Sequence, residues 1–395
     1  MNVLSRRGPR AGVARRAETG DTGRGRAGRR AAAPARLPLL ALGVVSLLAG
    51  LWGGLLLLGL SLPTLRSTTA ADHGPLMALG FLGTVISLER AVALRRAWGF
   101  VAPAAAGVGA LALIAGLPGV IGWSLLCLAS VVFLLVYAVV MMISPALHVG
   151  VMAAGGLCWY VATVLWLGGR SIPQIVPWLA GFLVLTIIGE RLELARVALL
   201  SRSSVRAFAL GGGAFAAGLA LTTITGRVAE IGVRVAGAGL LALAAWGVRY
   251  DIARRTIRLG GVTRFMACCL LGGYAWLLVA GLTWLAAGDL GGSVALYDAA
   301  LHAVFLGFVM SMIFGHAPVI VPAVLGVRLP FRPWFYAHVA LLHAALVLRL
   351  LGGDALGNRI AWQVGGAGTE LAVVLFLAVS VATALRARRS RAGAA

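Results

Sequence analysis

The stretch Leu37–Leu62, which reads LPLLALGVVSLLAGLWGGLLLLGLSL, contains no charged residue and decides the fold class of this protein. A helix rises 1.5 Å per residue and the hydrocarbon core of a bilayer is about 30 Å thick, so a run of this length can cross a membrane. Comparable runs recur as far as the C-terminus. The chain of 395 residues is 61% hydrophobic and only 12% charged, with a mean hydropathy of +0.97. The sequence therefore predicts an all-α membrane protein with many spans.

About twelve apolar segments are predicted to be transmembrane helices. They are Leu37–Leu62, His73–Leu94, Phe100–Leu117, Val120–Met141, Leu147–Leu167, Ile175–Ala195, Arg206–Thr225, Ile231–Val248, Phe265–Ala287, Val294–Pro318, Trp334–Leu351 and Ala361–Leu385. Residues 1–36 are rich in Arg, Gly and Ala and have no apolar period, which is typical of a disordered tail. We therefore predict a cytoplasmic tail at 1–36, a twelve-helix transmembrane domain at 37–385 and a basic cytoplasmic tail at 386–395.

The distribution of arginine predicts the orientation of the helices. The net charge is +22, and all 34 basic residues are arginine. Ten arginines precede Leu37, five lie between Arg249 and Arg264, and four follow Leu385, whereas the loops of the opposite side hold only Arg66, Arg170, Arg227 and Arg359. Both termini are therefore predicted to be cytoplasmic, because cytoplasmic loops carry the excess of basic residues. Topology explains the charge without a nucleic-acid partner, so we expect a multi-pass protein of a bacterial cytoplasmic (inner) membrane whose partner is the lipid bilayer.

Three of the predicted helices resemble one another. They read GFLGTVISLER at residues 80–90, GFLVLTIIGER at 181–191 and GFVMSMIFGHA at 307–317. Glu89, Glu190 and His316 each stand nine positions after the first glycine of their repeat. The repeats fall on the second, sixth and tenth helices, a constant spacing of four helices. Common secondary transporters with twelve helices instead repeat in sixes or in nested threes. We therefore predict a pseudo-threefold bundle built from three groups of four helices.

The residues of these helices resemble the NnrS-like membrane proteins, which are related to the catalytic subunit of the heme-copper oxidases. The matching pieces are HGPLMALGFLGT at 73–84, GERLEL at 189–194 and LHAVFLGFVMSMIFGHAPVI at 301–320. The resemblance implies a heme-copper-oxidase-like bundle that binds heme b. It also implies a role in the nitric oxide response or in membrane redox chemistry, with a redox partner that the sequence does not identify.

His73 and His302 are the main candidates for cofactor ligands. In the repeat alignment His73 lies seven residues before its glycine and His302 five, so their depths differ by only ~3 Å. Two imidazoles at one depth on two helices can hold a heme iron from its two faces. The resemblance implies the same role, because these two helices supply the low-spin heme ligands of the oxidases. In the alternative reading, His73 is an interfacial residue beside Asp72, and His302 is a packed core histidine.

Departures from the oxidase pattern argue against oxygen reduction. The oxidases place copper-binding histidines on the sixth and seventh helices, and neither helix has one in this sequence. The tenth helix of the oxidases carries two histidines spaced two residues apart, whereas Ala300 and Val304 flank His302 at that distance. Arg359, in the loop before the last helix, is a candidate partner for a heme propionate by the same resemblance. A solvated loop charge is the alternative for Arg359.

A weaker second site for copper or another metal is predicted nearer the inner side. Its candidates are His316, His338, His343, Glu89 and Glu190, since carboxylates and imidazoles bind copper, iron or zinc. In the alternative, Glu89 pairs locally with Arg90 and Glu190 with Arg191, and both pairs serve helix packing.

Other chemistry has no sequence signal. The four cysteines form no spaced metal-binding pair, and no phosphate-binding loop or nucleophile motif is present, so no catalytic residue is assigned. Two other functions stay open. One is a proton-coupled secondary transporter or permease that uses Glu89, Glu190 and His316, and the other is a non-catalytic assembly factor of a respiratory complex.

Overall fold

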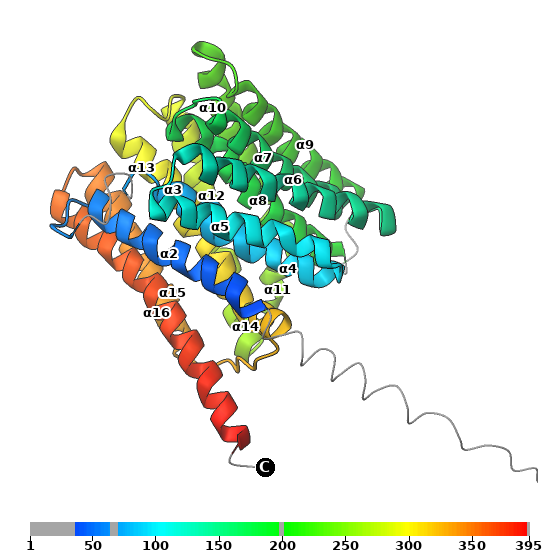
Figure 1. Ribbon diagram of the computed structural model, residues 1–395. Helices are drawn as coiled ribbons and strands as arrows, with labels where there is room; N and C mark the ends of the chain where they lie inside the picture. Colours follow the sequence, from blue (N-terminus) through cyan, green and yellow to red (C-terminus); the bar gives the residue numbers. More distant parts are fainter. Residues whose placement is uncertain (1–35, 64–69, 197–200, 393–395) are drawn as a thin grey trace, which may run out of the picture.

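The structure is a computed structural model that describes residues 36–63, 70–196 and 201–392. Every regular element in these ranges is helical, and twelve helices are long and apolar enough to cross a membrane (Figure 1). The predicted number of spans is therefore confirmed. The predicted N-terminal tail lies outside the described residues except for Arg36.

The twelve spans follow one another along the chain, four of them as composite helices. They are α2 (Leu37–Leu57), α3–η2–α4 (His73–Pro75, Leu76–Gly83 and Thr84–Leu94), η3–α5 (Ala97–Phe100 and Val101–Ala115), α6 (Gly119–Ile143), α7 (Leu147–Leu167), α8 (Ile172–Arg196), α9 (Arg202–Leu221), α10 (Arg227–Tyr250), α12 (Gly261–Ala287), α13–η4–α14 (Val294–His302, Ala303–Met310 and Ser311–Leu325), α15–η5 (Phe335–Val347 and Leu348–Ala355) and α16 (Arg359–Ala392). A short helix, α11 (Ala253–Thr256), lies in the loop before α12.

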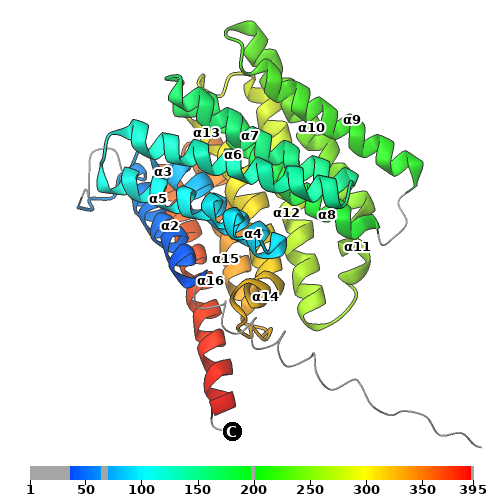
Figure 2. The same cartoon turned by 45° about the vertical axis from the view of Figure 1, so that its right-hand side comes forward.

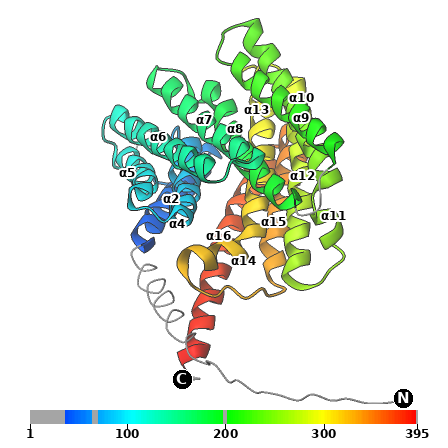
Figure 3. The ribbon, with the colours of Figure 1, turned by 90° about the vertical axis from the view of Figure 1, so that its right-hand side faces the viewer.

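Two helices are longer than the sequence predicts. The tenth span continues to Leu325 with Pro318 and Pro322 inside it, because neighbouring helices can satisfy the backbone groups that proline frees. The last helix continues to Ala392 through most of the predicted tail 386–395, a stretch made largely of the good helix formers Ala and Arg. It projects beyond the other helices at the end of the bundle where α14 also ends (Figures 1 and 3).

Glycine lets neighbouring helices approach closely. In α9, a Cβ added at Gly218 would collide with the backbone of Ala236 in α10, and one at Gly211 would lie 2.9 Å from Ala242 Cβ. The two helices lie side by side (Figure 2). Small residues are common at helix contacts in membranes, where dispersion forces between close backbones replace a hydrophobic driving force.

The three repeat helices lie at the centre of the bundle. In the most apolar part of α8, 83% of the residues are buried, the largest share among the twelve spans. It packs against η2 and η4, and α4 packs against α14. The last span, α16, packs against the first, α2, and so completes the ring of helices around them.

Both ends of the described chain lie at the same end of the bundle. The Nη1 atom of Arg36, just before α2, donates to the carbonyl of Val324 near the end of α14 at 2.9 Å. An even number of spans brings the end of α16 to this side as well. The cytoplasmic location of this end stays a prediction.

Candidate functional site

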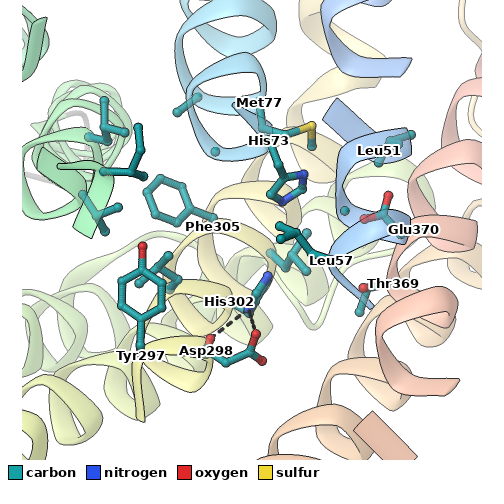
Figure 4. A pocket seen from close by; sticks show the side chains of 18 of the residues that line it. Leu51, Leu57, His73, Met77, Tyr297, Asp298, His302, Phe305, Thr369 and Glu370 are labelled. Atoms are coloured by element: carbon teal, nitrogen blue, oxygen red, sulfur yellow. Dashed lines mark hydrogen bonds and ion pairs between the residues drawn. The ribbon is translucent and has the colours of Figure 1, made fainter. Parts of the chain in front are cut away.

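A cavity of about 400 Å³ lies at the opposite end of the bundle from Arg36. It is bordered by the C-terminal half of α2, by α3–η2, α8, α13–η4 and η5, and by the N-terminal half of α16. Most of its lining is apolar, as Met77 and Phe305 illustrate (Figure 4). Ionisable side chains enter it from four helices: His73, Asp298 with His302, Arg349, and Glu370.

The structure brings His73 and His302 into this one cavity. Figure 4 shows the two imidazoles entering it from the second and tenth spans. The Nδ1 atom of His73 is 2.6 Å from the Gly50 carbonyl oxygen, and that of His302 is 2.8 Å from the Asp298 carbonyl oxygen. Because a carbonyl oxygen only accepts, each Nδ1 carries a proton, which in the neutral imidazole leaves the lone pair on Nε2. Metal-bound histidines generally have this arrangement, with the second ring nitrogen donating to a carbonyl or carboxylate.

His302 is also held by a buried polar network. Asp298 Oδ1 lies 3.2 Å from His302 Nδ1. Arg349 donates to both Asp298 oxygens, from Nε at 2.8 Å and from Nη2 at 2.7 Å. Trp362 Nε1 donates to Asp298 Oδ2 at 3.3 Å. Asp298 and Arg349 are 9% and 7% exposed, so the pair is shielded from water.

Sequence reasoning did not assign Asp298 and Arg349 to the site, although signals for both were present. Asp298 lies four residues before His302, which places both on one face of a helix. Arg349 is an arginine within an apolar span, where an ionisable residue is costly and tends to be functional. Arg359, the predicted propionate partner, is the first residue of α16, is exposed and does not line the cavity. Arg349 is the arginine that lines it.

Glu370 and Gly54 complete the side of the cavity near His73. Glu370 Oε2 is buried and has no hydrogen-bond partner within the described residues. Glycine at position 54 makes room for both neighbours. A Cβ there would lie 3.0 Å from His73 Cε1 and would collide with Glu370 Oε1. The absence of a side chain at this position therefore shapes the cavity.

Three π-helical segments, each of eight residues, border the cavity. The first, η2, begins three residues after His73, η4 begins directly after His302, and η5 contains Arg349. A π-helix widens the turn and re-aims the side chains of a helix, and such segments are frequent at functional sites. The apolar period does not predict these π-helical segments.

At the end of the bundle where Arg36 lies, one arginine binds both predicted second-site carboxylates. Arg90 Nη2 donates to Glu89 at 3.3 Å and also to Glu190, which belongs to α8. Arg191 does not pair with Glu190 as the local alternative held. It donates to both oxygens of Asp251, each at 2.8 Å.

Asp251, just past the end of α10, is the centre of its own network. Tyr274 donates to it at 2.7 Å and the Ala253 amide at 2.8 Å. Burial acts to raise the pKa of the Asp251 carboxyl, but the hydrogen bonds and charge of Arg191 outweigh it and hold the pKa below its usual value.

The three remaining histidines of the second site lie in different surroundings. His316 Nε2 lies 3.1 Å from Arg191 Nη1, and its Nδ1 bonds the Met312 carbonyl at 2.6 Å, so both nitrogens are occupied. His343 Nδ1 accepts from Trp276 at 2.7 Å. His338 is 1% exposed, and its nitrogens have no hydrogen-bond partner in the described part of the chain. Four phenyl rings surround it, those of Phe265, Phe314, Phe335 and Phe376.

Across the described ranges, no group of three or more His, Cys, Asp or Glu side chains is placed to hold a metal ion. The site for copper or another metal stays a prediction. The imidazoles of His73 and His302 differ from those of His316, His338 and His343 because both line the same cavity, each with Nδ1 bonded to a backbone carbonyl.

Residues 36–385 match a family described as a domain of unknown function (DUF8744). The chain belongs to this family. No curated protein and no solved structure matches it. The residues that line the cavity, from Leu51 to Val373, all fall within the DUF8744 segment, as do the Arg90 and Arg191 networks. The site is thus part of the domain that defines the family.

Proposed function

We propose that this DUF8744 protein binds heme b in the cavity, with His73 and His302 as the axial ligands. One observation carries the proposal: two imidazoles line a single cavity, and each uses Nδ1 on a backbone carbonyl while Nε2 keeps its lone pair. Neutral imidazole presented in this way is a common axial ligand of heme iron.

The size and polarity of the cavity are those of a small-molecule site. Small-molecule sites have volumes of roughly 300–1,000 Å³ and are mostly apolar with a few placed polar groups. The volume of about 400 Å³ falls in this range, and the polar groups are confined to the two imidazoles, Asp298, Arg349, Glu370 and a few hydroxyl and indole groups. Bound heme would supply one-electron redox chemistry or the binding of a small ligand. The chain's own part is to present the imidazoles and to keep water and lipid away.

The helix packing supports a pseudo-threefold arrangement of three four-helix groups. The fourth span packs on the fifth (α6 on α7), the eighth on the ninth (α10 on α12), and the twelfth on the first (α16 on α2). Within the groups the third and fourth spans also pack together, as α5 with α6, α9 with α10, and α15 with α16.

The glycines that open the three repeats behave alike. A Cβ at Gly80 would lie 2.8 Å from Ala110, one at Gly181 would lie 2.9 Å from Cys158 Sγ, and one at Gly307 would collide with Trp276. Each glycine thus allows its helix to approach an outer helix of the same four-helix group closely. This equivalence supports the heme-copper-oxidase-like plan and, with it, the assignment of the second and tenth spans as ligand helices.

The arginine distribution and the resemblance to NnrS-like proteins extend the proposal. Both termini would lie in the cytoplasm, the cavity would lie toward the outer side of a bacterial inner membrane, and the protein would act in the nitric oxide response or in membrane redox chemistry.

The test is an absorption spectrum of the full-length protein purified in detergent, first oxidised and then reduced. We expect a Soret band that shifts on reduction and about one heme per chain. The double variant His73→Ala/His302→Ala should lose the band, whereas His343→Ala, outside the cavity, should keep it. Full heme retention in the double variant would reject the assignment. Colourless wild type from heme-supplied cells, with proton-coupled uptake in vesicles, would favour the transporter alternative.

A further inference from the structure

We infer that the two ligands have different roles: His302 anchors the heme, and His73 is the exchangeable ligand whose place a small uncharged molecule such as a diatomic gas can take. This inference rests on the proposed heme site. It concerns which of the two imidazoles the protein holds firmly.

The surroundings of His302 fix its ring. Besides the Asp298 carbonyl, its Nδ1 faces the Asp298 carboxylate at 3.2 Å. That carboxylate is clamped by Arg349 through two hydrogen bonds of 2.7 and 2.8 Å and by Trp362 at 3.3 Å. The guanidinium of Arg349 also lies 5.2 Å from the centre of the Trp362 ring. His302 is thus tied to its own helix, to the eleventh span and to the twelfth.

The surroundings of His73 are looser. Its ring has one hydrogen bond, from Nδ1 to the Gly50 carbonyl, and no ion pair within the described residues. It is the first residue of the second span, directly after a turn at 70–72. Gly74 follows it, and nothing lies within 4 Å of a Cβ placed there. The small residues Gly54, Ala70, Ala71 and Gly74 line the cavity beside His73, so no bulky side chain at these positions holds the ring in place.

These differences bear on ligand strength. A hydrogen bond from Nδ1 to a carboxylate makes the opposite nitrogen more basic than a bond to a carbonyl does, and it also orients the ring. Loss of such a partner typically weakens metal binding by about 10- to 100-fold. The Nδ1 atom of His302 has the Asp298 carboxylate at 3.2 Å beside its hydrogen bond to the carbonyl, whereas that of His73 has the Gly50 carbonyl alone. When one ligand is displaced, His73 is therefore the one that leaves.

The experiment uses full-length His73→Gly and His302→Gly proteins, with carbon monoxide as the probe of the reduced state. We expect His73→Gly to keep heme near one per chain and to bind carbon monoxide at least ~10-fold faster than the wild type. In the wild type the observed rate should level off as carbon monoxide rises, because His73 must first leave. His302→Gly should lose most of its heme, and added imidazole should restore it.

Asp298 provides a second readout, which a purely structural role would not move. The double variant Asp298→Asn/Arg349→Gln removes both buried charges together, so that neither is left unpaired. It should hold heme ~10- to 100-fold more weakly than the wild type, and its reduction potential should shift upward because the His302 nitrogen is less basic.

Three results would overturn the inference while leaving the heme site intact. They are heme loss in His73→Gly with retention in His302→Gly, no carbon monoxide binding by the reduced wild type, and an unchanged potential in the Asp298/Arg349 variant. A wild type without a Soret band would instead refute the proposed function itself, so the two failures are distinguishable.

Discussion

Replacement of Asp251 by Asn is expected to destabilise the protein strongly, because it leaves the Arg191 guanidinium buried without its counter-ion. The side chains of the pair are 2% and 1% exposed, and two hydrogen bonds of 2.8 Å join them. Asparagine has nearly the same size but lacks the charge and one of the two acceptors, on which Tyr274 and the Ala253 amide also depend. The effect should therefore come from charge and hydrogen bonding and not from a cavity.

The expected magnitude follows from burial. Breaking a buried ion pair by removing one partner costs about 3–5 kcal/mol, which is about two to four orders of magnitude in the unfolding equilibrium. The matched control is Glu230→Gln, which removes the pair of Glu230 with Arg234. This pair is separated by 3.8 Å, and its side chains are 44% and 47% exposed. Water screens such a pair, so the control should cost less than about 1 kcal/mol.

The assay heats the detergent-solubilised protein and measures the temperature at which half of it is no longer monodisperse. The proteins compared are the wild type, Asp251→Asn, Glu230→Gln and the double variant Asp251→Asn/Arg191→Gln. The double variant should recover part of the loss, because no charge remains unpaired. An Asp251→Asn protein as stable as the Glu230→Gln control, or a double variant no better than the single one, would refute the reasoning.

Three further predictions follow from the same contacts. The pKa of Asp251 is lowered in the folded protein, so its contribution is complete above its unfolded pKa of about 3.9 and is lost as the pH falls below that value. The stability difference between the wild type and Asp251→Asn, measured by the same assay, should thus stay constant from pH 7 to about pH 5 and shrink only below about pH 4. Gly54→Ala should lower the heme content, because its methyl group crowds His73 and Glu370 at a cost of about 1–3 kcal/mol. Gly212→Ala, with nothing within 4 Å, should leave the heme content unchanged. Arg349→Gln should reduce the heme content and alter the spectrum, whereas Arg359→Gln should change neither, since only Arg349 lines the cavity.

The sequence was sufficient for the spans and for the depth of the candidate ligands. Apolar length sets which segments cross a bilayer, and counting residues along helices sets the level that each side chain reaches. Depth and the family resemblance together single out His73 and His302, and the structure places both in one cavity.

The sequence did not predict which side chains pair with one another, because pairing depends on how each helix is rotated about its axis. The apolar surface of a membrane helix extends around the whole helix, so its period does not reveal which face meets a neighbour. Arg191 therefore pairs with Asp251 and not with the adjacent Glu190. The same reason explains why Arg349 and not Arg359 reaches the cavity: η5 is a π-helix, and its wider turn changes the direction of its side chains.

The candidate residues of the two ends differ in the hydrogen bonds that they make. At the end of the bundle where Arg36 lies, Arg90 joins Glu89 and Glu190, and Arg191 joins Asp251 and His316, so Glu89, Glu190 and His316 all have partners that help to fix the central helices.

In the cavity at the other end, the imidazoles of His73 and His302 each keep a lone pair, and Glu370 Oε2 has no partner in the described part of the chain. Buried polar groups without partners are costly, and a protein retains them where something else completes their bonds. The candidate transporter residues Glu89, Glu190 and His316 are thus already bonded to arginines that join helices. The candidate heme ligands His73 and His302 each have one ring nitrogen that remains available to a ligand.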